Sequence, residues 1–144
     1  MEQKGSNVNR PFLVDSDVLI DYLKGFNLAC DLMETHIDRI GLSVITIAEI
    51  RAGIKGREEE QAFEQFLSAI PHYNVTRTIA EMGGDWVRQF GRSHGVEIPD
   101  ALIAATATTH NLELKTLNTK HYPMIKDLAQ AYQKRTVSSS KCNG

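Results

Sequence analysis

The 144-residue sequence is poor in cysteine and proline, carries little net charge and has no long apolar run. Its two cysteines, Cys30 and Cys142, are far apart and too few to form a structural zinc site. With only 4 prolines and 10 glycines, it is neither collagen-like nor of low complexity. No apolar stretch approaches the roughly 20 residues that a membrane-spanning helix requires. We therefore expect one globular domain that neither spans a membrane nor is anchored in one.

The charge balance narrows the possible partners. A formal net charge of −2 differs from the strongly basic character typical of nucleic-acid-binding domains. If the substrate is a polyanion, a metal ion or a local basic patch must attract it. The first residues, MEQKGSNVNRP, lack the basic and then apolar pattern of a secretory signal, so we expect a cytoplasmic protein.

Short apolar runs alternate with amphipathic segments along the chain. The pattern predicts strands at 12–14, 40–45, 73–75 and 112–117. It predicts helices at 18–23, 28–37, from 46 onward, and at 57–70, 78–94, 100–110 and 127–135. Strands separated by helices indicate an α/β domain with a parallel sheet covered on both faces. We place this domain at 11–135, between a flexible N-terminus (1–10) and a flexible C-terminal tail (136–144).

Polar side chains occur where predicted strands meet helices. These are Asp15 with Asp17, then Glu49, Asp100 and Asn118. Open parallel sheets place their ligands at the carboxyl ends of the strands, so one edge of the sheet can gather these side chains.

Each acid also has a purely structural explanation. Asp15 and Asp17 can cap a helix and interact with its dipole. Glu49 ends the segment 46–49 (TIAE), which matches a capping box, and Asp100 follows Pro99 at a predicted helix start. A single acid would mean little, and it is the number of such junctions in one short domain that favours a site.

Acids gathered at one edge repel one another unless a cation neutralises them. Oxygen ligands without a histidine or cysteine cluster suit Mg²⁺, with Mn²⁺ as a substitute. Such an ion can polarise a phosphodiester and lower the pKa of its bound water. The sequence thus points to metal-assisted phosphodiester chemistry.

Four segments occur in an order and spacing that match a known family. They are FLVDSDVLID (12–21), SVITIAEI (43–50) with the following Gly53, IPDALIAATA (98–107) and LKTLNTKHY (114–122). With these segments the chain resembles the PIN-domain ribonucleases, specifically the VapC toxins of toxin–antitoxin pairs. The resemblance implies a three-layer α/β domain whose central parallel sheet of four or five strands is flanked by helices.

The resemblance also implies a metal-dependent endoribonuclease that leaves 3′-hydroxyl and 5′-phosphate ends. Asp15, Glu49 and Asp100 match the principal acids of the family and would hold the Mg²⁺. Many relatives have a further aspartate at the position of Asn118 or of His121, and this chain has neither. We therefore expect one firmly held ion, with Asn118 orienting a metal-bound water.

Substrate contacts are less clearly marked. Thr116 matches a family hydroxyl residue near the site, although a strand also favours threonine. Candidate phosphate contacts are Arg88 and Arg92, one turn apart on a predicted helix, and Lys115 and Lys120 in the last segment. Solvated surface charge is the competing explanation for all four.

For three other residues we expect a structural role rather than a place in the site. Asp21 and Lys24 have the three-residue spacing of an ordinary helix surface pair. Trp86 is interpreted as a core or dimer contact rather than a base-stacking platform.

The resemblance further implies a VapB-type antitoxin that covers the site and inserts a basic side chain among the acids, and self-association into a homodimer. Apolar residues of the early predicted helices are suitable for a docking groove; they are Leu19, Tyr22, Leu23, Leu28 and Leu32.

Two other functions remain open at this point. A haloacid-dehalogenase-type phosphatase would use Asp15 as a nucleophile, although the sequence shows no convincing later lysine and paired-aspartate motif. A catalytically weak PIN-like module that binds RNA or protein is the other. The sequence does not identify the RNA target, since PIN-type specificity depends on loop shape and RNA fold.

Overall fold

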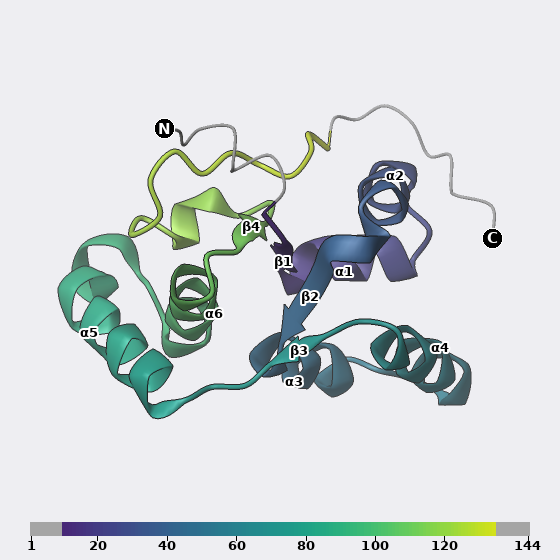
Figure 1. Cartoon of the computed structure of the whole chain (residues 1–144), viewed down its shortest axis with the longest axis horizontal. Coiled ribbons are helices and arrows are strands. Elements are labelled where there is room, and N and C mark those ends of the chain that lie inside the picture. The colour runs from purple at the N-terminus through teal and green to yellow at the C-terminus, as the bar shows by residue number, and fades with distance from the viewer. Residues whose placement is uncertain (1–9, 135–144) are drawn as a thin grey trace.

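A four-stranded parallel sheet forms the centre of the computed structural model, which describes residues 10–134 (Figure 1). The strands are β1 (Phe12–Val14), β2 (Ile40–Ser43), β3 (His72–Tyr73) and β4 (Glu113–Lys115), in the spatial order β3-β2-β1-β4. The helices are α1 (Ser16–Leu23), α2 (Asn27–Thr35), α3 (Val44–Ala52), α4 (Arg57–Ser68), α5 (Arg77–His94) and α6 (Ile98–Thr109), with short 3₁₀ turns η2 (Ile37–Arg39) and η3 (Thr119–His121). Apart from Arg10, the predicted flexible ends at 1–10 and 136–144 lie outside the described residues.

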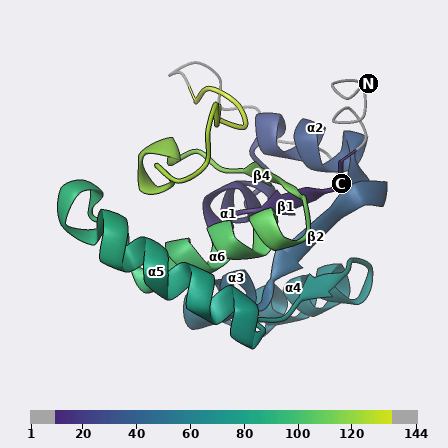
Figure 2. The same cartoon turned by 60° about the vertical axis from the view of Figure 1, so that its left-hand side comes forward.

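The central strand β1 is buried on both faces of the sheet. Phe12 and Val14 point to one hydrophobic cluster, formed mainly with α1 to α4. Leu13, between them, points to the second cluster, which contains Ile103 and Ala104 of α6. Helices α5 and α6 lie side by side in both views (Figures 1 and 2). The predicted three-layer α/β architecture with a central parallel sheet is therefore confirmed.

Helix α3 begins earlier than the sequence pattern predicted. Strand β2 ends at Ser43, whose hydroxyl accepts the backbone N–H of Ile45 at 3.0 Å and caps the helix. Glu49 therefore lies in the body of α3, and its interpretation as the last residue of a capping box is wrong. Its carboxylate is left available for another role.

Helices α5 and α6 also start before their predicted first residues. The hydroxyl of Thr76 accepts the N–H of Ile79 at 3.2 Å, so α5 begins at Arg77 rather than at Thr78. Helix α6 begins at Ile98, and Asp100 lies in its first turn without making a side-chain cap bond. The cap interpretation of Asp100 is therefore wrong as well.

The predicted helix at 127–135 does not form in the described part of that range. Residues 123–134, here called the C-terminal strap, run without helix along β4, and Asp127 has a left-handed backbone with φ 58°. The strap bonds outward instead: the N–H of Ala131 donates to Thr116 O and Gln130 Nε2 donates to Leu117 O, both at 2.9 Å. These contacts with the loop after β4 replace the hydrogen bonds of a helix.

The strap also changes the interpretation of Asp21. This residue is 8% exposed, and its carboxylate accepts bonds from Tyr132 Oη at 2.7 Å and Lys134 Nζ at 3.1 Å. The predicted surface pair with Lys24 is wrong, because Asp21 anchors the strap to α1. Trp86 packs partly buried against the second cluster, as its interpretation as a core residue predicted.

Between residues 10 and 134, none of the helices is both long and apolar enough to cross a membrane.

Candidate active site

The candidate site lies where the neighbouring parallel strands β1 and β4 end. Asp15 directly follows β1, and its backbone N–H donates to Lys115 O, the last residue of β4, at 2.9 Å. Thr116 and Asn118 follow β4. The rule that ligands bind at the carboxyl ends of strands therefore applies to this edge of the sheet.

Asp15 is buried, and hydrogen bonds fix both of its carboxylate oxygens. Oδ1 accepts the N–H of Ser16 at 2.8 Å, so the residue does cap α1. Oδ2 accepts two side-chain hydroxyls, from Thr116 at 2.8 Å and from Tyr122 at 2.7 Å. Capping and a place in the site are thus combined in one residue.

Asp100 approaches Asp15 from α6 on the opposite side of the tyrosine hydroxyl. Tyr122 Oη lies 3.4 Å from Asp100 Oδ1, and His121 Nδ1 lies 3.3 Å from Asp100 Oδ2. Two acids that are 85 positions apart in the sequence therefore share one hydroxyl group. The structure brings them together, although Asp100 lies in the first turn of α6, which follows α5 rather than a strand.

Glu49 joins these acids through electrostatics rather than through a shared donor. Its side chain is exposed on α3, yet partial loss of water raises its pKa above the ordinary value. A hydrogen bond with Ser16 lowers the pKa, whereas the charges of Asp15 and Asp100 raise it. Glu49 therefore faces the same negative region.

The same crowding affects the other carboxylates. Burial, followed by repulsion from Asp15, raises the pKa of Asp17 to about 6. Burial raises the pKa of Asp100, which His121 lowers and Asp15 raises further. Each of these groups would release its proton more readily beside a cation, so the region favours a bound positive charge.

The donor set fits a hard divalent cation. Asp15, Glu49 and Asp100 offer carboxylate oxygens, and Asn118 offers an amide oxygen because its Nδ2 donates to Asp17 at 3.1 Å. No group of three acidic, histidine or cysteine side chains within residues 10–134 is already close enough to hold a metal ion. The acids form a shared negative edge, of which Glu49 is an exposed member.

Asp17 has a larger part in the site than the sequence analysis gave it. Its Oδ2 accepts the N–H of Leu117 at 3.0 Å together with the amide of Asn118, and its Oδ1 accepts the N–H of Val18 at 2.7 Å. Asp17 thereby holds the loop after β4 against α1. Its position two residues after Asp15 was the available signal, although the sequence did not show what it would hold.

Tyr122, the last residue of the segment 114–122, was not predicted to take part in the site. Its side chain is 1% exposed and it lies in the second hydrophobic cluster. Burial and the neighbouring charges of Asp15 and Asp100 raise the pKa of Tyr122 above its ordinary value, so the hydroxyl keeps its proton and donates. A buried tyrosine beside two acids leaves no pattern that distinguishes it from a core aromatic residue.

Thr116 is fully buried, and its hydroxyl donates to Asp15. This placement does not fit the predicted contact with substrate, because the side chain has no surface to offer. It fits a residue that orients an acid.

The predicted phosphate contacts lie farther out. Arg92 and Lys120 are exposed, in the last turn of α5 and in η3 respectively. Arg88 bonds to Asp85 at 2.8 Å and Lys115 to Glu113 at 2.9 Å. Within the described residues, no ion pair joins any of these four to the acids.

A protein-family model matches the part of the chain that contains this site. The model described as "PIN domain" matches residues 12–125, which include every acid discussed above. The chain belongs to the PIN domain family. The alternative interpretation of the chain as a haloacid-dehalogenase-type phosphatase was therefore wrong.

Relatives of this PIN domain include two proteins of Mycobacterium tuberculosis. "Ribonuclease VapC10" is 39% identical over 81% of this chain and 89% of its own length. "Ribonuclease VapC19" is 36% identical over 83% of this chain and 98% of its own length.

Among solved structures, a "Toxin-antitoxin complex from Klebsiella pneumoniae" contains a chain with 32% identity to this PIN domain and a TM-score of 0.73. The match covers 85% of this chain and 98% of that chain. VapBC-1 from nontypeable Haemophilus influenzae, at 23% identity and a TM-score of 0.65, shares the fold.

Proposed function

We propose that this PIN domain is a metal-dependent endoribonuclease toxin of the VapC type. The observation that carries the proposal is the single tyrosine hydroxyl shared by Asp15 and Asp100 at the strand ends, with Glu49 facing the same charge. The 39% identity to a protein named as a ribonuclease supports the choice of RNA as substrate.

Asp15, Glu49 and Asp100 are the residues that would hold Mg²⁺ or Mn²⁺, through carboxylate oxygens. When bound, the ion would polarise the phosphodiester and supply a bound water of lowered pKa. Asn118, which is exposed and donates its Nδ2 to Asp17, would orient the attacking water through its amide oxygen. Thr116 and Asp17 act from behind, holding Asp15 and the loop after β4 in place.

Exposed basic side chains would complete the site by contacting the phosphates of the RNA backbone. Arg92 and Lys120 are assigned this role, since phosphate contacts position a nucleic acid without reading its sequence. Both side chains are exposed and unencumbered by an ion pair with the acids, as such a role requires.

The deciding experiment compares RNA cleavage by the purified chain with and without Mg²⁺ or Mn²⁺. Cleavage should require the metal, and Asp100→Asn should abolish it while the circular dichroism spectrum is unchanged. Asp31→Asn is the matched control, because Asp31 is an exposed aspartate on α2, away from the strand ends. Metal-independent cleavage, or full activity in Asp100→Asn, would contradict the assignment.

A catalytically weak binding module is the remaining alternative, since this chain has Asn118 in place of a further acid. Metal-dependent cleavage would exclude it. Mapping new RNA 5′ ends after induced expression would then identify the target.

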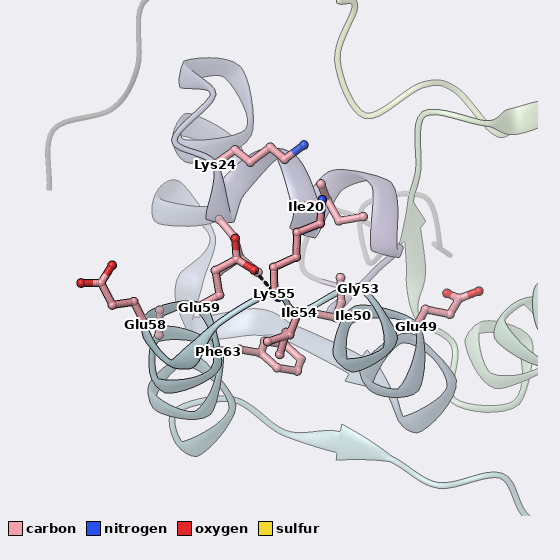
Figure 3. Close-up of a pocket in the computed structure, with 12 residues that line it drawn as sticks. Ile20, Lys24, Glu49, Ile50, Gly53, Ile54, Lys55, Glu58, Glu59 and Phe63 are labelled. Carbon is pink, nitrogen blue, oxygen red and sulfur yellow. Dashed lines mark hydrogen bonds between the residues drawn. The ribbon is translucent and has the colours of Figure 1, made fainter.

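The proposal includes a VapB-type antitoxin as partner, and a groove between α1, α3 and α4 is where we expect it to dock. The groove has a volume of about 470 Å³ and is lined mostly by apolar side chains, Ile20 and Leu23 among them. Ile20 and Leu23 are 40% and 39% exposed, so the groove offers apolar surface to a partner. Figure 3 shows Glu49 at one end of this groove and Glu58 at the other.

This arrangement fits an amphipathic helix that carries a basic residue. Its apolar face would cover Ile20 and Leu23, and its cation would reach Glu49, which belongs to both the groove and the acidic edge. Ile20→Asp should therefore prevent antitoxin binding and leave RNA cleavage intact. Inhibition of the Ile20→Asp variant by the antitoxin at the unmodified protein's dose would contradict this docking site.

We also propose that the protein is cytoplasmic and forms a homodimer. Static light scattering should give twice the chain mass of 16.1 kDa, and the mass of one chain would contradict the dimer.

A further inference from the structure

The hydroxyl of Tyr122 occupies a special position among the contacts of the site, because it bonds to acids from two different elements. It lies 2.7 Å from Asp15 Oδ2, after β1, and 3.4 Å from Asp100 Oδ1, on α6. Its own ring is buried in the hydrophobic cluster of α6 and β4. The core on that face of the sheet therefore fixes the position of the oxygen between the two acids.

Hydrogen-bond geometry shows which acid depends on it more. A hydroxyl has one proton to donate, and the distance of 2.7 Å is that of a strong O–H···O⁻ bond, whereas 3.4 Å is at the limit. The proton therefore goes to Asp15. Asp100 Oδ1 lies on the other side of the same oxygen, so the buried tyrosine separates the two carboxylates by its size rather than by a second donated bond.

Thr116 strengthens this arrangement from a second direction. Its hydroxyl donates to the same Oδ2 of Asp15 at 2.8 Å, and Ser16 occupies Oδ1. With three donors on one buried carboxylate, Asp15 has little rotational freedom. The direction of its remaining lone pairs is then set by the protein before any ligand arrives.

From this geometry we infer that Tyr122 is a positioning residue for the divalent cation: its hydroxyl aims the carboxylate of Asp15 and sets the distance to Asp100. This inference rests on the proposed function. It assigns to Tyr122 a role that acts through the metal ligands Asp15 and Asp100. Partners of metal ligands of this kind contribute about 10- to 100-fold to metal affinity.

The chain contains a matched control for this inference. Tyr132 donates to Asp21 Oδ2 at 2.7 Å, the same chemistry at the other end of α1. Tyr132→Phe removes a hydroxyl bond to a buried aspartate, as Tyr122→Phe does. A general loss of stability would affect both variants, whereas a loss of metal positioning would affect only Tyr122→Phe.

The experiment measures Mn²⁺ binding to the unmodified chain, Tyr122→Phe and Tyr132→Phe from the electron paramagnetic resonance signal of free Mn²⁺. We expect about 10-fold weaker binding in Tyr122→Phe and unchanged binding in Tyr132→Phe. The Mn²⁺ concentration for half-maximal RNA cleavage should rise by the same factor in Tyr122→Phe, while the rate at saturating Mn²⁺ stays within about threefold.

Three outcomes would contradict the inference. Binding in Tyr122→Phe within twofold of the unmodified chain would remove the positioning role, and an equal loss in Tyr132→Phe would show a structural effect. Unmodified protein that binds no Mn²⁺ would contradict the proposed function itself, a failure distinguishable because it appears before any substitution is made. Circular dichroism and thermal melting of both variants establish that each is folded.

Discussion

Helix α1 carries a buried aspartate at each end, and the two differ in what neutralises them. Asp21, near its C-terminus, accepts bonds from Tyr132 and from Lys134, so its charge has a cationic partner within the chain. Asp15, at its N-terminus, accepts bonds from neutral groups alone among residues 10–134, namely a backbone N–H and two hydroxyls. Each acid accepts a bond from a different tyrosine hydroxyl, Asp15 from Tyr122 and Asp21 from Tyr132, and both distances are 2.7 Å.

The comparison separates a structural acid from one prepared for a ligand. Neutral donors fix the direction of a carboxylate without cancelling its charge, whereas an ammonium group cancels it. Repulsion among the acids at the Asp15 end therefore persists: burial is the main cause of the raised pKa values of Asp17, Glu49 and Asp100, and the charge of Asp15 raises all three further. That end is the one at which an added cation stabilises the protein.

The largest expected effect comes from exchanging aspartate for asparagine at the two ends. Asp15→Asn should lower the rate of RNA cleavage about 1000-fold, since metal-supplied charge stabilisation is worth several kcal/mol. Asp21→Asn should leave cleavage within about threefold. Single-turnover cleavage at saturating Mn²⁺ measures both, and equal losses would show that the two acids serve one purpose.

For the free energy of unfolding, Asp21→Asn should have a larger effect than Asp15→Asn. Asp21→Asn weakens the charge-assisted bonds from both Tyr132 and Lys134 to a buried carboxylate, and should lower the free energy of unfolding by about 2 kcal/mol. Asp31→Asn, on the exposed face of α2, is the control and should change it by less than about 0.5 kcal/mol. Urea denaturation in metal-free buffer measures the difference. An Asp21→Asn protein as stable as the control would mean that the strap is not anchored there.

The uncompensated charge should also make stability depend on pH. The pKa of Asp17 is about 6 in the folded chain against an ordinary 3.8, so its contribution is fully present below pH 3.8 and is lost as the pH rises through 6. After allowance for solvent screening, we expect a loss of about 1 kcal/mol between pH 5 and 7 in metal-free buffer. Saturating Mn²⁺ should reduce this loss. Thermal melting across the range tests it, with Asp17→Asn as the variant in which the slope should flatten; an unchanged slope would point to other groups.

The smallest effect should come from the cation at the compensated end. Lys134 is half exposed, and its ion pair with Asp21 is therefore screened by water. Lys134→Met should cost about 0.5 kcal/mol of unfolding free energy and leave both Mn²⁺ affinity and cleavage unchanged. A change in Mn²⁺ affinity in this variant would show that the two ends of α1 are coupled.

The sequence was informative where a residue's role depends on its near neighbours. The apolar run Phe12–Val14 followed by Asp15 predicted both a buried strand and an acid at its end, because three apolar residues bounded by a polar one fit few other structures. The parallel sheet followed from the alternation of such runs with helices. These two features predicted the place of Asp15 at the edge of the sheet, whereas Asp100 reaches it from the first turn of α6, which no strand precedes.

Prediction failed where a residue's partner is distant in the sequence. Asp21 resembled a helix surface acid because Lys24 is nearby, while its actual partners, Tyr132 and Lys134, are more than 100 positions away. Residues 127–135 resembled a helix, since nothing local indicated that they would instead form hydrogen bonds with the loop after β4. Tyr122 was missed for the same reason: its two acids are 107 and 22 positions away.

The distances that defeat local prediction also set the order in which the site can be completed. Asp15 leaves the ribosome early, but the hydroxyls that orient it belong to Thr116 and Tyr122, 101 and 107 residues later. Strand β4, the last of the strands that the structure describes, lies beside β1 and directly before Thr116. A growing chain therefore has Asp15 without the hydroxyls that orient it until Tyr122 has been synthesised, and the acidic site can be completed only after that residue has folded into the core.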